Sequence, residues 1–220
     1  TNNITGVLGT DPTTYDATSA AARQSLAELS GAQENDDRAI FLPPSIMRAV
    51  KGANIALFNP VQDISKQMRT GIVGYADSFD WYESMSLYRH TAGTWAGAVT
   101  LATTSVTGDS SLALTCTSGD TFLQGDVLAV AASNYVNVNT RRAPNTVLKR
   151  FVVTQSVTAT STVATVPISP TIYGPGSQYQ NVDALPVAGA ALTLFPGTTS
   201  PNGLVGVQGL AFTRNAFALV

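Results

Sequence analysis

The beginning of the chain has apolar positions at helical spacing. They recur at steps of seven, four and three residues, which places them on one helix face: Tyr15, Ala22, Leu26 and Leu29. Asp11-Pro12 is a typical helix start, because the aspartate can accept unpaired backbone N–H groups and the proline needs no donor of its own. Gly31 is a typical left-handed stop. We therefore predict an amphipathic helix that begins at Asp11-Pro12 and ends at Gly31.

Short apolar runs follow, and turn signals separate them. Residues 38–42 are apolar and end at Pro43-Pro44, which predicts a buried strand, and residues 53–58 repeat this pattern. Residues 59–71 begin with Asn-Pro and end with glycine, which predicts a second helix. Its apolar face consists of Val61, Ile64 and Met68. Residues 79–90 are rich in aromatic side chains and predict another strand.

Residues 93–198 give strand signals throughout and no helix signal. Residues 111–116 and 126–130 alternate with period two, and further strand-like runs cover 147–157, 161–168 and 191–195. Glycine–aspartate pairs provide the turns: Gly108-Asp109, Gly119-Asp120 and Gly125-Asp126. We interpret these aspartates as turn residues rather than catalytic carboxylates, because glycine tolerates positive φ and aspartate bonds its neighbouring backbone. The turn spacing predicts a small barrel or sandwich of about six strands.

The end of the chain becomes apolar and strand-like again after residue 203. We expect this tail to return to the sheet of the first part, which would make the β-rich middle an insertion. The predicted domains are therefore residues 1–92, 93–198 and 199–220. Because the chain begins with Thr1 and its last five residues read as an interrupted strand, we expect it to be part of a longer protein.

Composition narrows the classes of function. Only 12% of the residues are charged, about half the usual share of roughly 25%, and the net charge is −2. A chain without a net basic charge is a poor candidate for binding DNA, RNA or an anionic membrane. Cys116 is the one cysteine, so no internal disulfide can form. The longest weakly polar stretch, residues 185–195, is too short to cross a bilayer, and no targeting segment is recognisable.

The candidate chemistry in the first part of the chain is sparse. His90 could act as a general base with Asp80 or Glu83, which keeps a hydrolase as a third hypothesis, but no Ser-His-Asp arrangement accompanies it. One histidine and one cysteine exclude a structural zinc site built from these residue types. The acidic residues 34–37 lack the spacing of a calcium loop and favour a solvated loop. We expect no catalytic, cofactor or metal site.

Two pairs of cations in the β-rich part are better candidates for an interaction site. Arg141-Arg142 and Lys149-Arg150 flank a loop that contains Pro144 and Asn145. They could bind an acidic partner, or they could be solvent-exposed side chains at a hairpin tip without a partner. The sequence leaves both interpretations open.

Several motifs, taken together, resemble the major capsid (coat) proteins of tailed bacteriophages, specifically the P22-type coat family with an HK97-like fold and an inserted β-domain. In the first part they are Leu57-Phe58-Asn59-Pro60, Gly71-Ile72-Val73-Gly74, Phe79-Asp80-Trp81-Tyr82 and His90-Thr91-Ala92-Gly93-Thr94. In the middle they are Gly125-Asp126-Val127, Tyr135-Val136-Asn137 and Leu148-Lys149-Arg150-Phe151-Val152-Val153. At the end they are Leu210-Ala211-Phe212 and Asn215-Ala216-Phe217-Ala218-Leu219. Their order and spacing, which span nearly the whole chain, carry the resemblance.

The resemblance implies an α+β axial domain formed by residues 1–92 and 199–220, interrupted by an inserted all-β barrel or sandwich at residues 93–198. The N-terminal arm, the extended loop, the spine helix and part of the peripheral domain would then lie outside this chain. The implied function is that of a structural, non-enzymatic capsid subunit that self-assembles into the icosahedral shell around packaged double-stranded DNA.

The resemblance also implies partners and a location. The partners would be copies of the same chain in pentamers and hexamers, with portal, scaffolding or decoration proteins as further candidates, and the contact with DNA would be non-specific. The location would be the virion, after assembly in the host cytoplasm, with no cofactor and no membrane. On this interpretation Arg141, Arg142, Lys149 and Arg150 are candidates for charged contacts between subunits. The alternative is a β-rich module of a virion or cell surface that binds a carbohydrate or a receptor.

Overall fold

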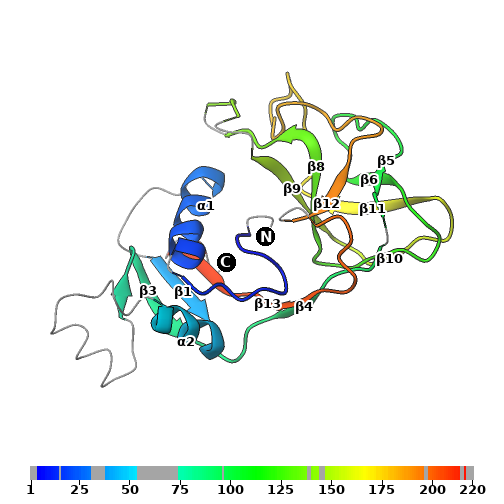
Figure 1. Cartoon of the computed structure of the whole chain (residues 1–220). Helices are drawn as coiled ribbons and strands as arrows, with labels where there is room; N and C mark the ends of the chain where they lie inside the picture. Colours follow the sequence, from blue (N-terminus) through cyan, green and yellow to red (C-terminus); the bar gives the residue numbers. More distant parts are fainter. Residues whose placement is uncertain are drawn as a thin grey trace, which may run out of the picture. The chain divides into compact units, whose positions relative to one another are not determined.

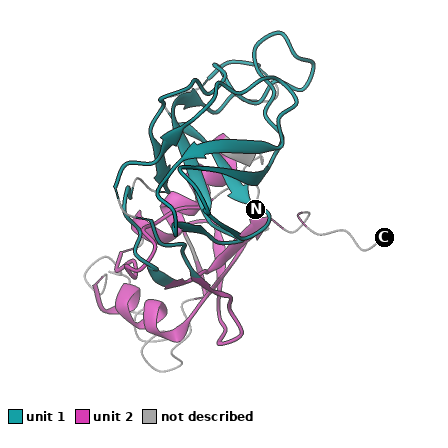
Figure 2. Ribbon diagram, turned by 90° about the vertical axis from the view of Figure 1, so that its right-hand side faces the viewer, with its two compact units in different colours: residues 1–3, 91–205 teal, residues 4–90, 206–220 magenta. Residues whose placement is uncertain are grey.

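The structure is a computed structural model that describes residues 4–14, 16–30, 38–53, 74–95, 97–137, 140–143, 147–195, 198–213 and 216. The described residues form mostly β-sheet, with two short α-helices. Contacts divide the chain into two compact units, shown in Figure 2: residues 1–3 with 91–205, and residues 4–90 with 206–220. We call them the barrel unit and the helix-sheet unit.

The first helix of the helix-sheet unit begins later than its sequence predicts. A π-helical turn, η1 (Asp16–Ala20), leads into α1 (Ala21–Ser30). The Oγ1 atom of Thr14 accepts the backbone N–H of Ala17 at 3.2 Å, which is the role of an N-cap. Asp11-Pro12 precedes the helical residues and does not start them. Thr14 was overlooked because the Asp-Pro pair is the stronger local signal, and the predicted stop at Gly31 lies outside the described residues.

Helix α2 (Pro44–Ala53) was missed in the sequence interpretation. The prediction that Pro43-Pro44 ends the preceding strand is confirmed, since β1 (Arg38–Leu42) stops there. The same prolines also begin a helix, because a proline is well tolerated in the first turn, where its missing N–H has no partner to lose. The predicted strand at residues 53–58 is wrong at Ala53, which ends α2. The rest of that strand and the helix predicted at residues 59–71 lie outside the described residues.

A four-stranded sheet forms the centre of the helix-sheet unit, in the order β14-β1-β3-β2. The other strands of this sheet are β2 (Tyr75–Ala76), β3 (Phe79–Glu83) and β14 (Leu210–Thr213), and β2 pairs with β3 at the edge of the sheet. β3 runs parallel to β1, and β14 runs antiparallel to β1 on its other side. The sheet therefore combines segments from near the beginning and near the end of the chain. The aromatic run predicted as one strand at residues 79–90 forms β3 and, after a break, β4 (Arg89–Thr91).

Both α-helices contribute to one hydrophobic core with this sheet. β1 and β3 alternate between faces, so that side chains at every second position join the helices. The buried members of this core are Ala22, Ile40, Leu42, Ile46, Met47, Val50, Phe79 and Trp81. On the other face of the sheet, aromatic rings stack on one another. The ring centroid of Phe41 lies 4.9 Å from that of Tyr82 and 5.8 Å from that of Phe212. Tyr82 is 48% exposed, so this second face is only partly covered by described residues.

The barrel unit is a closed six-stranded β-barrel (Figure 1). Its strand order is β12-β8-β9-β11-β6-β5, and the strands are β5 (Thr100–Leu101), β6 (Ser111–Thr115), β8 (Val127–Asn134), β9 (Leu148–Val153), β11 (Val163–Ser169) and β12 (Leu192–Leu194). A β-bridge from Thr100 to Ala191 joins the two edge strands, and Leu192 N–H donates to Val99 O at 2.9 Å. Of the two forms predicted, barrel or sandwich, the hydrogen bonds support the barrel.

Alternating side chains fill the barrel. In β9, Lys149, Phe151 and Val153 are buried, and the residues between them are less so. A short pair, β7 (Thr121–Phe122) with β10 (Val157–Thr158), lies outside the six-stranded ladder. The ring of Trp95 stacks on Phe122 at 5.0 Å between centroids, and both side chains are fully buried.

The two connections between the units run side by side. β4 pairs with β13 (Val205–Val207) in a two-stranded ladder. The pairing continues into the barrel unit, where Ala92 N–H donates to Leu204 O at 2.8 Å and Gly203 N–H donates to Gly93 O at 3.2 Å. The chain thus enters and leaves the barrel unit along one paired segment.

Candidate interaction surface

Three turns of the barrel unit share one construction. In each, a positive-φ glycine precedes an aspartate: Gly108-Asp109, Gly119-Asp120 and Gly125-Asp126. The aspartate carboxylate accepts the backbone N–H three residues earlier, at 2.7 Å for Asp109, 2.7 Å for Asp120 and 2.8 Å for Asp126. Each aspartate N–H also donates to the carbonyl of that same earlier residue. The interpretation of these aspartates as turn residues is confirmed.

The remaining carboxylate of the barrel unit is also engaged in backbone bonding. Asp183 accepts the backbone N–H of Asn134 at 2.6 Å and its side-chain amide at 2.8 Å. Residues 91–205 contain four acidic residues, all aspartates, and each of them accepts a backbone N–H. These carboxylates stabilise the backbone of the barrel unit, and their hydrogen bonds keep the negative charges at fixed positions within it.

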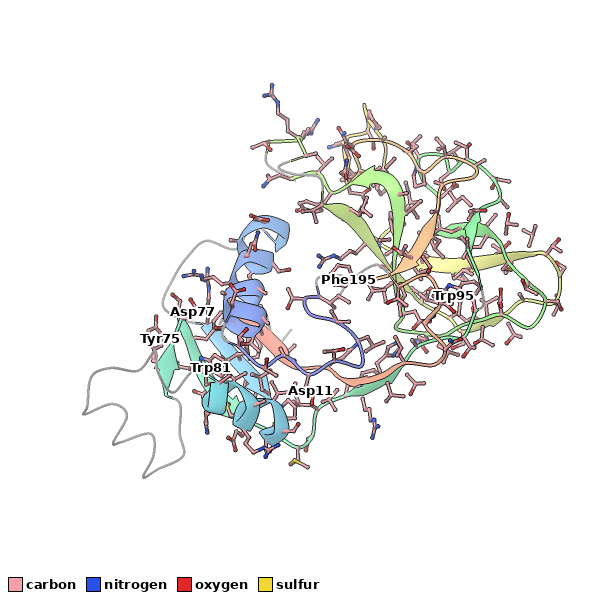
Figure 3. The ribbon with its side chains drawn as sticks, viewed as in Figure 1. Asp11, Tyr75, Asp77, Trp81, Trp95 and Phe195 are labelled. Carbon is pink, nitrogen blue, oxygen red and sulfur yellow. The ribbon has the colours of Figure 1, made fainter. Side chains whose placement is uncertain are left out.

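Two of the four candidate cations pack against aromatic rings. The Nζ atom of Lys149 lies 5.0 Å from the ring centroid of Tyr135, and the guanidinium carbon of Arg150 lies 3.8 Å from that of Phe195, which is labelled in Figure 3. Such cation–π contacts stabilise a desolvated charge. Burial lowers the pKa of Lys149 to about 8 and that of Arg150 to about 10.

The other two candidate cations, Arg141 and Arg142, are exposed. They lie in the connection between β8 and β9, where Asn137 N–H donates to Arg142 O at 3.0 Å and Arg141 N–H donates to Asn137 O at 2.8 Å. These bonds hold Arg141 in the left-handed region at a φ of +54°. In the described part of the chain, neither guanidinium lies within ion-pair distance of a carboxylate.

An aromatic pair lies beside this connection. Tyr173 and Tyr179 are 5.7 Å apart between ring centroids, and Tyr179 is 67% exposed. The segment that carries them is folded back on itself, because Asn181 Oδ1 accepts Tyr173 N–H at 2.9 Å and Asn181 Nδ2 donates to Thr171 O at 2.7 Å. The guanidinium of Arg141 donates to Gln178 O at 3.5 Å, which joins the two segments. The two tyrosines are six residues apart in the sequence, and the fold brings their rings together.

Of the residues considered for catalysis, those that the structure describes form no catalytic arrangement. His90 is 3% exposed in β4, with its ring 6.1 Å from that of Tyr88. Glu83 pairs with Lys51 at 3.2 Å, and Asp80 is exposed on β3. Among the residues that the structure describes, no group of three or more His, Cys, Asp or Glu side chains could hold a metal ion. The acidic residues 34–37 lie outside the described residues.

Cys116 is partly buried and follows β6. Desolvation raises the pKa of its thiol, and the negative charge of Asp120 raises it further, which disfavours the reactive thiolate. None of the described helices is long and apolar enough to cross a membrane.

The chain was compared with protein families, curated proteins and solved structures. No family model matches the chain, and no curated protein matches it. Among solved structures, the chain is similar to the CUS-3 coat protein I-domain, with 24% sequence identity over 46% of this chain and 96% of that chain. The TM-score of this likeness is 0.34.

Proposed function

We propose that this chain is a structural capsid subunit of a tailed bacteriophage, which self-assembles into the icosahedral shell around packaged double-stranded DNA. One observation carries the proposal beside the sequence resemblance. β14 lies next to β1 in one sheet, so the barrel unit is inserted between two segments of the same sheet. That is the organisation which the resemblance to P22-type coat proteins implies, with residues 1–92 and 199–220 as the axial domain and residues 93–198 as the insertion.

The physical character of the barrel unit supports this proposal. Shell subunits are crowded against many copies of themselves, and exposed strand edges in such a setting can pair wrongly with neighbours. The bridge from Thr100 to Ala191 removes the free edges of the six-stranded sheet. The low charge of the chain, with a net value of −2, also limits repulsion between neighbouring copies.

The partners follow from the same proposal. Copies of the chain would meet in pentamers and hexamers, portal, scaffolding or decoration proteins would join them, and the packaged DNA would lie near without specific recognition. The protein would function in the virion after assembly in the host cytoplasm. We propose charged subunit contacts for Arg141, Arg142, Lys149 and Arg150. The geometry favours the first two, because the ring contacts of Lys149 and Arg150 already occupy these side chains.

Electron microscopy of the intact protein that contains this chain tests the proposal. Expression in bacteria, with and without co-expressed neighbouring genes, should give uniform closed shells whose density contains the barrel. A protein that stays monomeric at all concentrations, under both conditions, would contradict the proposed function.

A second function is favoured by one observation, the exposed tyrosine pair. Paired aromatic rings beside polar side chains are typical of carbohydrate-binding sites, where a ring stacks on the apolar face of a sugar. Tyr179 contacts the ring of Tyr173 and follows Gln178, whose backbone carbonyl accepts the Arg141 guanidinium at 3.5 Å. A glycan array probed with the intact protein and with Tyr179→Ala tests this alternative. Binding that the substitution abolishes would support it, and an array without signal would remove it.

A further inference from the structure

The barrel unit has equal numbers of acidic and basic residues, but their side chains differ in how accessible they are. Residues 91–205 contain four acidic and four basic residues. All four carboxylates accept backbone N–H groups, and two of the cations lie on aromatic rings. The cations that remain exposed, Arg141 and Arg142, are adjacent in sequence and lie in one loop. The barrel unit therefore presents its accessible positive charge at one place.

The backbone at this place is held in an unfavourable conformation. Arg141 has a φ of +54°, a region that costs a residue with a Cβ about 1 kcal/mol or more relative to glycine. Two backbone hydrogen bonds maintain it, one from Arg141 N–H to Asn137 O and one from Asn137 N–H to Arg142 O. Conformations of this kind concentrate at functional sites, where the surrounding structure enforces them. A glycine would relieve the strain but would remove the guanidinium.

Tyr179 adds an exposed aromatic side chain to the surface that carries Arg141 and Arg142. It is 67% exposed, contacts the ring of Tyr173, and follows Gln178, whose carbonyl accepts the Arg141 guanidinium at 3.5 Å. Arginine and tyrosine are the residue types that most often dominate the energy of protein–protein contacts. The combination of two exposed guanidinium groups and an exposed phenol ring fits a carboxylate-bearing protein surface.

We propose that the surface formed by Arg141, Arg142 and Tyr179 docks onto carboxylates of a second copy of this chain. Charge complementarity favours this occupant. Outside residues 91–205 the sequence holds more acidic than basic residues. The exposed, described carboxylates there include Asp11, Asp16 and Asp80. The inference deepens the proposed function and rests on it, because it requires copies of the chain to associate.

Charge reversal in the intact protein tests this surface. Arg141→Glu/Arg142→Glu should lower the yield of assembled shells at least tenfold, because opposite charges become like charges at the contact. Arg141→Lys/Arg142→Lys is the matched control that keeps the charge, and it should retain most of the yield with a steeper loss in high salt. Tyr179→Ala should lower the yield severalfold, and Tyr179→Phe should preserve it. The thermal unfolding of unassembled subunits should change little in all variants, because the three side chains are exposed and lose at most the 3.5 Å bond to Gln178 O and the ring contact with Tyr173.

The outcomes separate this inference from the proposed function. Wild-type shells together with full assembly of the charge-reversed variant would overturn the docking surface and leave the capsid function standing. Absence of wild-type shells would overturn both. If the reversed variant fails to fold, Arg141→Gln/Arg142→Gln takes its place in the same comparison, with the same tenfold criterion. Full assembly of a folded Arg141→Gln/Arg142→Gln variant would likewise contradict the proposal.

Discussion

The carboxylate of Asp126 accepts the backbone N–H of Gly93 at 3.0 Å, and Asp126 is fully buried. The same carboxylate accepts Leu123 N–H at 2.8 Å, so one side chain ties the incoming segment of the barrel unit to the turn before β8. Thr94 and Thr121 reinforce this link, since Thr121 N–H donates to Thr94 O at 2.8 Å. Asp126 is therefore both a turn residue and a long-range link to the segment by which the chain enters the barrel unit.

Gly93→Ala should destabilise the barrel unit by about 3 kcal/mol, at the upper end of the usual cost of overpacking. A Cβ at this position would collide with the carbonyl oxygen of Thr121 and lie 3.0 Å from the Asp126 carboxylate, and a backbone oxygen cannot move aside easily. Gly52→Ala is the control, because a Cβ in α2 would have no heavy atom within 4 Å. We expect that control to be neutral or to stabilise by up to about 1 kcal/mol. Urea titration measures both, and equal effects would contradict the collision.

The three glycine–aspartate turns should differ in their contribution to stability in the order of their burial. Substitution by alanine should cost about 0.5–1 kcal/mol at the half-buried Asp109 and about 2–3 kcal/mol at Asp126, because buried donors lose a partner that water cannot replace there. Asp120, 7% exposed, should fall between them. Because the turns are alike, each serves as a control for the others. Equal losses in chemical denaturation would show that burial does not set the contribution.

The two tryptophans allow the units to be followed separately. Trp81 belongs to the core of the helix-sheet unit and is 5% exposed, whereas Trp95 belongs to the barrel unit and is fully buried (Figure 3). Trp81→Phe should leave fluorescence that reports the barrel unit, and Trp95→Phe should leave fluorescence that reports the helix-sheet unit. We expect the barrel unit to unfold at the higher temperature, because most of the fully buried large side chains lie in it. Circular dichroism of each variant controls for the substitution itself, and a single shared transition would contradict independent unfolding.

Local signals explain which parts of the fold could be predicted. The strand at residues 38–42 and the alternation in residues 111–115 are confirmed, because a buried strand and a half-buried strand leave direct patterns in the sequence. Helix α2 was missed because Pro43-Pro44 was interpreted only as a stop, although proline also suits the first turn of a helix. Barrel closure between Thr100 and Ala191 had no local signal, since it joins residues far apart in sequence.

The candidate interaction surface was only partly predictable for the same reason. The burial of Lys149 could have been anticipated, because period two in β9 places it on the same face as Phe151 and Val153. The contact between Tyr173 and Tyr179 could not, because it depends on how Asn181 folds an irregular segment back on itself. That Arg141 would be the residue at positive φ was also hidden, since no glycine or asparagine marks the position.

Lys149 should make stability depend on pH between about 8 and 10.5. Burial lowers its pKa from 10.5 to about 8, so in this range the folded chain binds fewer protons than the unfolded chain, and stability rises with pH. Lys149→Met should therefore be more stable than wild type at pH 7, and this advantage should shrink by about 3 kcal/mol as the pH rises to 10.5. Urea denaturation at several pH values measures the difference. A constant difference would show that the ammonium on Tyr135 keeps its ordinary pKa and is well solvated.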